Sequence, residues 1–247
     1  MAKHRFGLVG KNIGYSFSKA HFAKKFEALN LLDYSYENLD FQDIAEFPIF
    51  LHNNQDLKGL NVTIPYKESI IPYLDKLSKK ATAIGAVNTI QFTKNGKLKG
   101  YNTDYYGFQK ALEPLLQAHH KKALLLGTGG ASKAVTYALN QMGIDTTYVS
   151  RNSSENTIGY NQINAATFRE YQIIINCTPL GTVPNVEVCP EIPYEYFNSN
   201  HIAFDLIYNP AETLFLQKAK QQGATIKNGL DMLVFQAEKA WEIWNKK

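Results

Sequence analysis

A glycine-rich turn between a short apolar run and an amphipathic segment constrains this chain more than any other feature. The run Ala123–Leu126 is strand-sized and leads directly into Gly127-Thr128-Gly129-Gly130-Ala131-Ser132. Apolar residues then recur at helical spacing, at positions 131, 134, 135, 138, 139 and 142. A second β-type run, Thr146–Val149, follows. This order predicts a strand, a crossover helix and a parallel strand, which together form the repeating unit of an α/β sheet.

Strand-like runs alternate with helical patterns along most of the remaining chain. Asn95-Gly96 separates two extended stretches, 86–92 and 97–102, and predicts a hairpin with a two-residue turn. Asn209-Pro210-Ala211-Glu212 predicts the start of a helix that Gly223 ends. Other predicted elements are strands at Phe6–Val9, Asn61–Ile64, Ile173–Cys177 and Ile202–Leu206, a helix whose apolar face holds Phe22, Phe26 and Leu29, and a last helix whose apolar face holds Leu230, Leu233, Val234, Ala237 and Trp241. The 247 residues are enough for one large domain or two small ones.

Composition excludes several classes of function. Lysine and arginine number 26 against 22 acidic residues, a net charge of +4, and the basic pairs are scattered, which disfavours nucleic acid as a partner. Because no apolar run is longer than a strand, neither a signal peptide nor a membrane span is expected. Two cysteines are too few for a disulfide scaffold, so we expect a reducing compartment, the cytoplasm. The six histidines show no metal-ligand spacing, and no metal is expected.

The glycine turn is suited to binding a phosphate group. Gly127 permits a tight turn, Gly129 lets the backbone approach a pyrophosphate, and the helix that follows offers free N–H groups at its positive end. The alternative is a tight turn without a ligand. About 20 residues on, where an acid would select NAD, the second strand ends in Ser150-Arg151-Asn152, so Arg151 indicates NADP unless it is an ordinary surface arginine.

A lysine and an aspartate in the first half form a candidate catalytic pair. Lys67 follows the strand-like run and Pro65, and we expect it in the first turn of a helix, where the positive helix end makes an ammonium unusual and suits it to proton transfer. Asp104 follows the predicted hairpin and could pair with Lys67. The alternatives are a solvated lysine and a helix N-cap at Asp104.

Eight motifs, in order and spread over nearly the whole chain, resemble the shikimate dehydrogenase family. They are Ser16-Phe17-Ser18, Asn61-Val62-Thr63 with Lys67, Gly85-Ala86-Val87-Asn88-Thr89, Asn102-Thr103-Asp104, the glycine turn, Asn176-Cys177-Thr178 with Leu180-Gly181, Asp205-Leu206-Ile207-Tyr208-Asn209-Pro210, and Gly229-Leu230-Asp231-Met232-Leu233 with Gln236. The resemblance implies reversible, NADPH-dependent reduction of 3-dehydroshikimate to shikimate, in the pathway to chorismate and the aromatic amino acids.

The resemblance also implies two domains and a set of site residues. Residues 1–102, joined again by 231–247, are expected to form the substrate domain, and residues 103–230 a Rossmann-like NADP domain. Lys67 and Asp104 are implied as the catalytic pair. The implied substrate contacts are Ser16, Ser18, Asn61, Thr63, Asn88, Asp104, Tyr208 and Gln236, and the implied cofactor contacts are Gly127, Gly129, Gly130, Ala131, Arg151, Asn152, Thr178, Leu206 and Gly229.

The sequence departs from the family pattern at two places and leaves rival functions open. Lys19 stands where the family often has proline, and Ser150-Arg151-Asn152 stands where many relatives have Asn-Arg-Thr or Asn-Arg-Ser. Separately, Ser132 takes the third position of the strict three-glycine turn. The rivals are a dehydrogenase that also accepts quinate or prefers NAD, and a ligand-binding regulator without catalysis, which an intact Lys67 and Asp104 disfavour. Both a monomer and a homodimer are compatible with the sequence.

Overall fold

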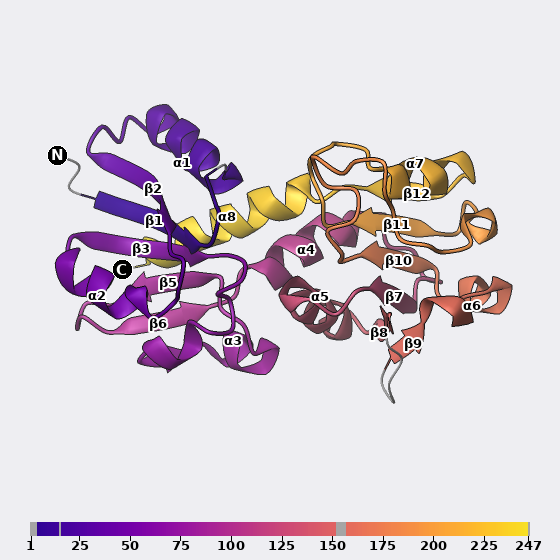
Figure 1. Ribbon diagram of the computed structural model, residues 1–247, viewed down its shortest axis with the longest axis horizontal. Coiled ribbons are helices and arrows are strands. Elements are labelled where there is room, and N and C mark those ends of the chain that lie inside the picture. Colours follow the sequence, from indigo (N-terminus) through magenta and orange to yellow (C-terminus); the bar gives the residue numbers. More distant parts are fainter. Residues whose placement is uncertain (1–3, 15, 152–156, 247) are drawn as a thin grey trace. The chain divides into compact units, whose positions relative to one another are not determined.

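The computed structural model describes residues 4–14, 16–151 and 157–246 (Figure 1). The chain forms two compact units: unit 1 comprises Met1–Asp104 and Gln236–Lys247, and unit 2 comprises Tyr105–Phe235. Each unit is built on its own sheet with helices packed against it. The predicted α/β class with two folded parts is confirmed.

Unit 1 contains a mixed sheet with strand order β2-β1-β3-β5-β6-β4. Strands β2 and β3 run parallel to β1, whereas β5 is antiparallel to both β3 and β6. The strands are β1 His4–Gly10, β2 Tyr34–Asp40, β3 Leu57–Val62, β4 Lys76–Leu77, β5 Thr89–Phe92 and β6 Leu98–Tyr101. The helices are α1 Phe17–Ala28, α2 Glu46–Asn53, the short η1 Ile71–Tyr73 and α3 Lys79–Ile84.

An aromatic cluster joins α1 and the end of the last helix to this sheet. Helix α8, Leu230–Trp244, packs Ala237, Trp241 and Trp244 against Phe22 and its neighbours. The indole of Trp244 lies where a side chain at position 59 would begin, because a Cβ on that glycine would come within 2.4 Å of it. The apolar face predicted for α1 holds only in part: Phe22 and Phe26 are buried, but Leu29 follows the helix and is 51% exposed.

The hairpin between β5 and β6 forms as predicted, but its turn is longer than two residues. Thr93 and Lys97 pair through their backbones, and the Gly96 amide donates to the Thr93 carbonyl. Gly96 alone in this turn has positive φ, +70°, whereas a two-residue turn of the predicted type needs positive φ at Asn95 as well. The Thr93 side chain explains the longer loop, since its hydroxyl both donates to the Lys97 carbonyl and accepts from the Lys97 amide.

Unit 2 contains an all-parallel sheet with strand order β12-β11-β10-β7-β8-β9. Counted from β7, this is the dinucleotide-binding order 3-2-1-4-5-6, whose direction reverses between β7 and β10. The strands are β7 Lys122–Leu126, β8 Asp145–Ser150, β9 Thr157–Gly159, β10 Ile173–Asn176, β11 Ile202–Asp205 and β12 Thr225–Lys227. The helices are α4 Asp104–Leu112, which begins on the last residue of unit 1, η2 Glu113–Leu115, α5 Gly130–Gln141, η3 Tyr160–Gln162, α6 Ala165–Glu170, η4 Tyr194–Tyr196 and α7 Leu214–Gln221.

One predicted helix start in unit 2 is wrong. Residues 209–212 are outside helix α7, which begins at Leu214. The cap is Thr213, whose hydroxyl accepts from the Leu216 amide and donates to Asp205 at 2.5 Å. A threonine tied to a buried carboxylate therefore decides the start, while Gly223, with φ +87°, follows the helix end near the predicted place. Across the described ranges, no helix is both long and apolar enough to span a membrane.

Candidate active site

Lys67 and Asp104 form an ion pair within unit 1. The Lys67 Nζ lies 2.7 Å from Asp104 Oδ2, and the two side chains are 17% and 8% exposed. The other carboxylate oxygen accepts from the Asn88 side chain at 2.8 Å. Both oxygens are therefore held in place. The Asp104 amide donates to the side chain of Asn102. The side chain that hydrogen-bonds the N-terminus of α4 is therefore that of Asn102 and not that of Asp104.

The surroundings of Lys67 differ from the prediction. No α-helix follows β3, because residues 64–70 form consecutive turns that lead into η1. These turns are fixed at two places: the Val87 amide donates to the Lys67 carbonyl at 2.7 Å, and the buried Tyr66 hydroxyl donates to the Phe41 carbonyl. The electrostatic partner of Lys67 is thus a carboxylate rather than a helix end.

Asn88 is the centre of a buried amide and hydroxyl network around this pair. Its Nδ2 donates to Asp104 and to Thr103 Oγ1, at 2.8 and 2.9 Å, and is 3.3 Å from Gln236 Oε1. Its Oδ1 accepts from the Thr103 amide at 2.6 Å. Asn88 is 2% exposed and Gln236 is 6% exposed. The network connects residues separated by as many as 148 positions in the chain.

Asn61 extends the network along β3. Its Nδ2 donates to the Asn88 carbonyl at 3.1 Å and to Thr89 Oγ1 at 3.2 Å, and its Oδ1 accepts from the Tyr36 hydroxyl at 2.8 Å. The fold therefore brings Lys67, Asp104, Asn88, Asn61 and Gln236 together, although separate segments of the chain supply them.

The other residues implied as substrate contacts lie in different parts of the fold. Ser16 caps α1, accepting from the Lys19 amide, and Ser18 lies near the Tyr36 phenol, whose pKa it lowers against the larger raising effect of burial. The Thr63 amide donates to the Val9 carbonyl, which fixes the chain as it leaves β3. Tyr208 belongs to unit 2, in the loop between β11 and α7.

The glycine turn of unit 2 connects β7 to α5, as predicted. Gly127 has φ +99°, which a residue with a side chain rarely adopts, and a Cβ there would lie 2.9 Å from the Thr178 side chain. Gly129 is the N-cap of the 12-residue helix α5, and a Cβ there would meet no atom within 4 Å. Ser132 replaces the third glycine without a clash because its hydroxyl turns back to the Gly129 carbonyl at 2.6 Å.

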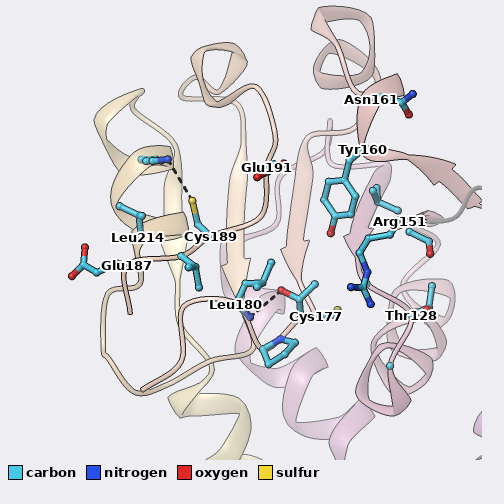
Figure 2. Close-up of a pocket in the computed structure, with 18 residues that line it drawn as sticks. Thr128, Arg151, Tyr160, Asn161, Cys177, Leu180, Glu187, Cys189, Glu191 and Leu214 are labelled. Atoms are coloured by element: carbon cyan, nitrogen blue, oxygen red, sulfur yellow. Dashed lines mark hydrogen bonds between the residues drawn. The ribbon is translucent and has the colours of Figure 1, made fainter. Parts of the chain in front are cut away.

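A cavity of about 1110 Å³ opens beside this turn, between the ends of β7, β8 and β10. Figure 2 shows Arg151 and Thr128 on one side and Cys189 and Leu214 on the other. Of the implied cofactor residues, Gly127, Gly129, Arg151 and Thr178 line the cavity. Gly130 and Ala131 instead form the first turn of α5, Leu206 and Gly229 meet by close backbone approach outside it, and Asn152 lies outside the described residues.

These residues fit a dinucleotide. The cavity lies where the strand order reverses, its wall at Gly129 has room for a diphosphate, and the start of α5 presents backbone N–H groups. The exposed Arg151 adds a positive charge at the end of β8, and this strand ends without an acid. Within the described residues no three histidine, cysteine or acidic side chains gather into a metal site.

A second buried carboxylate supports the loops beside the cavity. Asp205, fully buried at the end of β11, accepts from Thr213 Oγ1, the Ile207 amide and Asn176 Nδ2. Asn176 in turn accepts from the amide and hydroxyl of Thr178. Burial raises the pKa of Asp205 to about 6, while the three hydrogen bonds act in the opposite direction.

Several cavity residues were not predicted from the sequence. Tyr160 points into the cavity from η3, and Lys218 on α7 donates to Cys189 at 3.4 Å (Figure 2). Tyr160 follows β9, a strand of three residues that is too short to recognise by periodicity. Only the alternation of strands and helices could have indicated a third parallel strand whose end reaches this edge.

Comparisons with known proteins agree with this geometry. Residues 8–90 match the family described as the shikimate dehydrogenase substrate binding domain. The shikimate dehydrogenase (NADP(+)) of Methanosphaera stadtmanae is 38% identical over 98% of this chain and 91% of its own length. The chain belongs to the shikimate dehydrogenase family.

Solved structures of the family superpose on nearly the whole chain. Shikimate dehydrogenase 1 from Peptoclostridium difficile is 39% identical, with a TM-score of 0.83 over 98% of this chain and 91% of that one. The Thermus thermophilus enzyme, solved with NADP(H) and shikimate, is 33% identical, with a TM-score of 0.85 over 98% and 93%. A quinate dehydrogenase from Corynebacterium glutamicum, solved with NAD, is 25% identical, with a TM-score of 0.83 over 98% and 93%.

Proposed function

We propose that this protein is an NADP-dependent shikimate dehydrogenase that reversibly reduces 3-dehydroshikimate to shikimate. The observation that carries the proposal is the Lys67–Asp104 pair at 2.7 Å, set among the amides of Asn88, Asn61 and Gln236. Reduction of a ketone leaves negative charge on oxygen, so a positioned proton donor is required. Neutral amides suit a polyol because each can pair with a hydroxyl group.

In the proposed reaction NADPH supplies a hydride to the ketone carbon, and the carbonyl π electrons move onto oxygen. Lys67 donates a proton from Nζ to that oxygen, which gives the alcohol and a neutral amine that solvent reprotonates. Asp104 holds the Lys67 side chain in place, and Asn88 keeps Asp104 oriented. In the direction of shikimate oxidation, the neutral Lys67 accepts the proton.

We propose that residues 1–102 with 231–247 bind the substrate, through Ser16, Ser18, Asn61, Thr63, Asn88 and Gln236, with Asp104 and Tyr208 as further contacts. Residues 103–230 would hold NADP through the turn at Gly127–Ala131, Arg151, Asn152, Thr178, Leu206 and Gly229. The cavity beside the turn and the charge of Arg151 support this division. We further propose a cytoplasmic enzyme, consistent with the free cysteines at 177 and 189, that works as a monomer or a homodimer.

The proposal is tested by following NADPH absorbance with purified protein, NADP and shikimate. NAD with shikimate and NADP with quinate are run in parallel, together with NAD and quinate. We expect the highest kcat/KM for NADP with shikimate. Turnover of quinate with NAD at a higher kcat/KM would favour the rival dehydrogenase, and shikimate binding without turnover by any pair would favour a ligand-binding regulator.

A further inference from the structure

Tyr36 on β2 lies at the far end of the hydrogen-bond network that surrounds the Lys67–Asp104 pair. Its ring is stacked on Phe22, with centroids 4.6 Å apart, and the residue is 7% exposed. Its hydroxyl donates to Asn61 Oδ1 at 2.8 Å. Burial raises the Tyr36 pKa, so the hydroxyl keeps its proton at neutral pH.

The directions of these hydrogen bonds are determined by the partners. The Asn88 carbonyl can only accept, so the Asn61 Nδ2 must face it, as the 3.1 Å distance reflects. Asn61 Oδ1 then faces Tyr36, and the phenol must donate to it. The donor from Tyr36 therefore selects one of the two orientations of the Asn61 amide.

Tyr36 reaches Asn61 across the sheet. Strand β1 lies between β2 and β3, pairing Phe6 with Tyr36 on one side and Leu8 with Asn61 on the other. Phe6 and Leu8 are two residues apart, and alternate residues of a strand share a face. Tyr36 and Asn61 therefore project to the same side of the sheet. The length of the tyrosine side chain lets its hydroxyl bridge this diagonal.

We propose that Tyr36 is a positioning residue for substrate recognition, which fixes the side chain of Asn61 for contact with shikimate. This inference rests on the part of the proposed function by which Asn61 binds shikimate. Among the described residues, Asn61 is the one to which the Tyr36 hydroxyl donates, so Tyr36 acts through it and not on the Lys67–Asp104 pair directly.

The test compares Tyr36→Phe with Tyr34→Phe. Tyr34 lies on the same strand and the same face and stacks on His4 and Phe6, but its hydroxyl forms no hydrogen bond with the described part of the chain. Losing one buried hydrogen bond should raise the KM for shikimate about 10-fold in Tyr36→Phe. We expect kcat to change less than about threefold and NADP affinity to stay unchanged. Tyr34→Phe should match wild type within about twofold.

A double-mutant cycle separates positioning from a merely structural role. Asn61→Ala should raise KM on its own, and adding Tyr36→Phe should raise it little further, because the phenol acts through the missing amide. Unchanged KM in Tyr36→Phe, or multiplicative losses in the double mutant, would overturn the proposal. Equal losses of shikimate and NADP affinity would also overturn it, since they would indicate general destabilisation.

Two readouts do not depend on turnover. Calorimetric titration with shikimate alone should show the same loss of affinity in Tyr36→Phe, even if wild type binds shikimate without oxidising it. In that case the proposed function fails while this inference stands. In NMR spectra, the Asn61 side-chain amide protons should exchange faster with solvent in Tyr36→Phe than in wild type. Unchanged Asn61 signals in a folded Tyr36→Phe protein would overturn the inference without any substrate.

Discussion

In unit 1 the polar groups of the site are buried side chains, whereas in unit 2 they are largely backbone groups at the edge of a cavity. Asn88 is hydrogen-bonded to Asn61, to Gln236 and to Asp104, so the orientations of these side chains are fixed by the fold itself. Gly129 presents an open backbone beside a cavity of about 1110 Å³. A polyol requires side chains that distinguish hydroxyl groups, and a diphosphate requires only N–H groups and space.

The two buried aspartates show the same difference. Asp104 is paired with the Lys67 ammonium, so its charge has a partner that can also move a proton. Asp205 accepts only neutral hydrogen bonds, from Thr213, Asn176 and the Ile207 amide, and burial raises its pKa. We therefore propose that Asp104 takes part in catalysis, whereas the hydrogen bonds of Asp205 hold the loops after β10 and β11 together.

The largest effect is expected from removing the lysine of unit 1. Lys67→Ala should lower kcat by about 10²–10⁴-fold, the usual contribution of general acid–base catalysis, with NADP affinity unchanged. The exposed Lys58 on β3 provides the control, since Lys58→Ala should keep wild-type kcat. Near-normal kcat in Lys67→Ala would remove the lysine from the mechanism.

Lys67 and Asp104 should act as one catalytic unit. Asp104→Asn should raise the KM for shikimate as well as lower kcat, because the carboxylate orients Lys67 and is a proposed substrate contact. The double mutant should lose much less than the product of the single losses, which steady-state kinetics can measure. Fully multiplicative losses would show that the two residues act independently.

The next largest effect is on the free energy of unfolding, which should depend on pH through Asp205 of unit 2. The folded Asp205 binds its proton with a pKa of about 6, against 3.8 for the unperturbed group, so the folded state holds the extra proton between these values. The contribution of this group to stability is therefore highest below pH 4 and falls by up to about 3 kcal/mol as the pH rises through 6.

Asp205→Asn lacks this titration and provides the reference. Urea unfolding of both proteins from pH 4 to 7 should show wild type losing stability relative to Asp205→Asn as the pH rises. A difference that stays constant over this range would contradict the proposed burial cost of the charged carboxylate.

A smaller effect is expected at the nucleotide end of the cavity. Arg151→Ala should weaken NADP binding by about 10- to 50-fold and NAD binding much less, since only NADP carries the phosphate that a guanidinium pairs with. Arg169→Ala, on the exposed face of α6, serves as a control for a lost positive charge. Equal losses for both dinucleotides in Arg151→Ala would reject this assignment.

The smallest effects separate the two glycines of the turn. Gly127→Ala should lower the free energy of unfolding by about 1–2 kcal/mol, because its φ of +99° disfavours a Cβ. Gly129→Ala should leave stability unchanged yet weaken NADP binding, because its Cβ would occupy open space meant for the diphosphate. Calorimetric titration and urea unfolding measure both; equal effects of the two changes on stability would contradict the geometry.

Local signals in the sequence were enough for the first strand–helix–strand unit of unit 2. The glycine turn, the helical spacing after it and the flanking β-type runs occupy consecutive residues, so the strand, turn and helix of β7, α5 and β8 could be predicted directly. The cavity lies where the strand order reverses, and that order is seen in the structure, since alternation of strands and helices alone does not determine it.

Local signals failed where a distant residue made the decision. The start of α7 depends on Thr213 being tied to Asp205 on β11, and the hairpin turn depends on the Thr93 side chain bonding to Lys97. Tyr36 gave no signal, because the short, polar run of β2 does not show which side chain will cross β1 to reach Asn61.

The proposed catalytic residues could be named from the sequence, through motifs in family order, but their environment was decided by tertiary structure. Sequence reasoning expected a helix end beside Lys67 and a pairing with Asp104. The fold supplies the pairing, across 37 residues, but no helix end, and it adds the hydrogen bond from Asn88 to Asp104. Backbone conformation is set largely by neighbours along the chain, whereas the charge and hydrogen bonds around a side chain depend on which strands lie next to each other in the sheet.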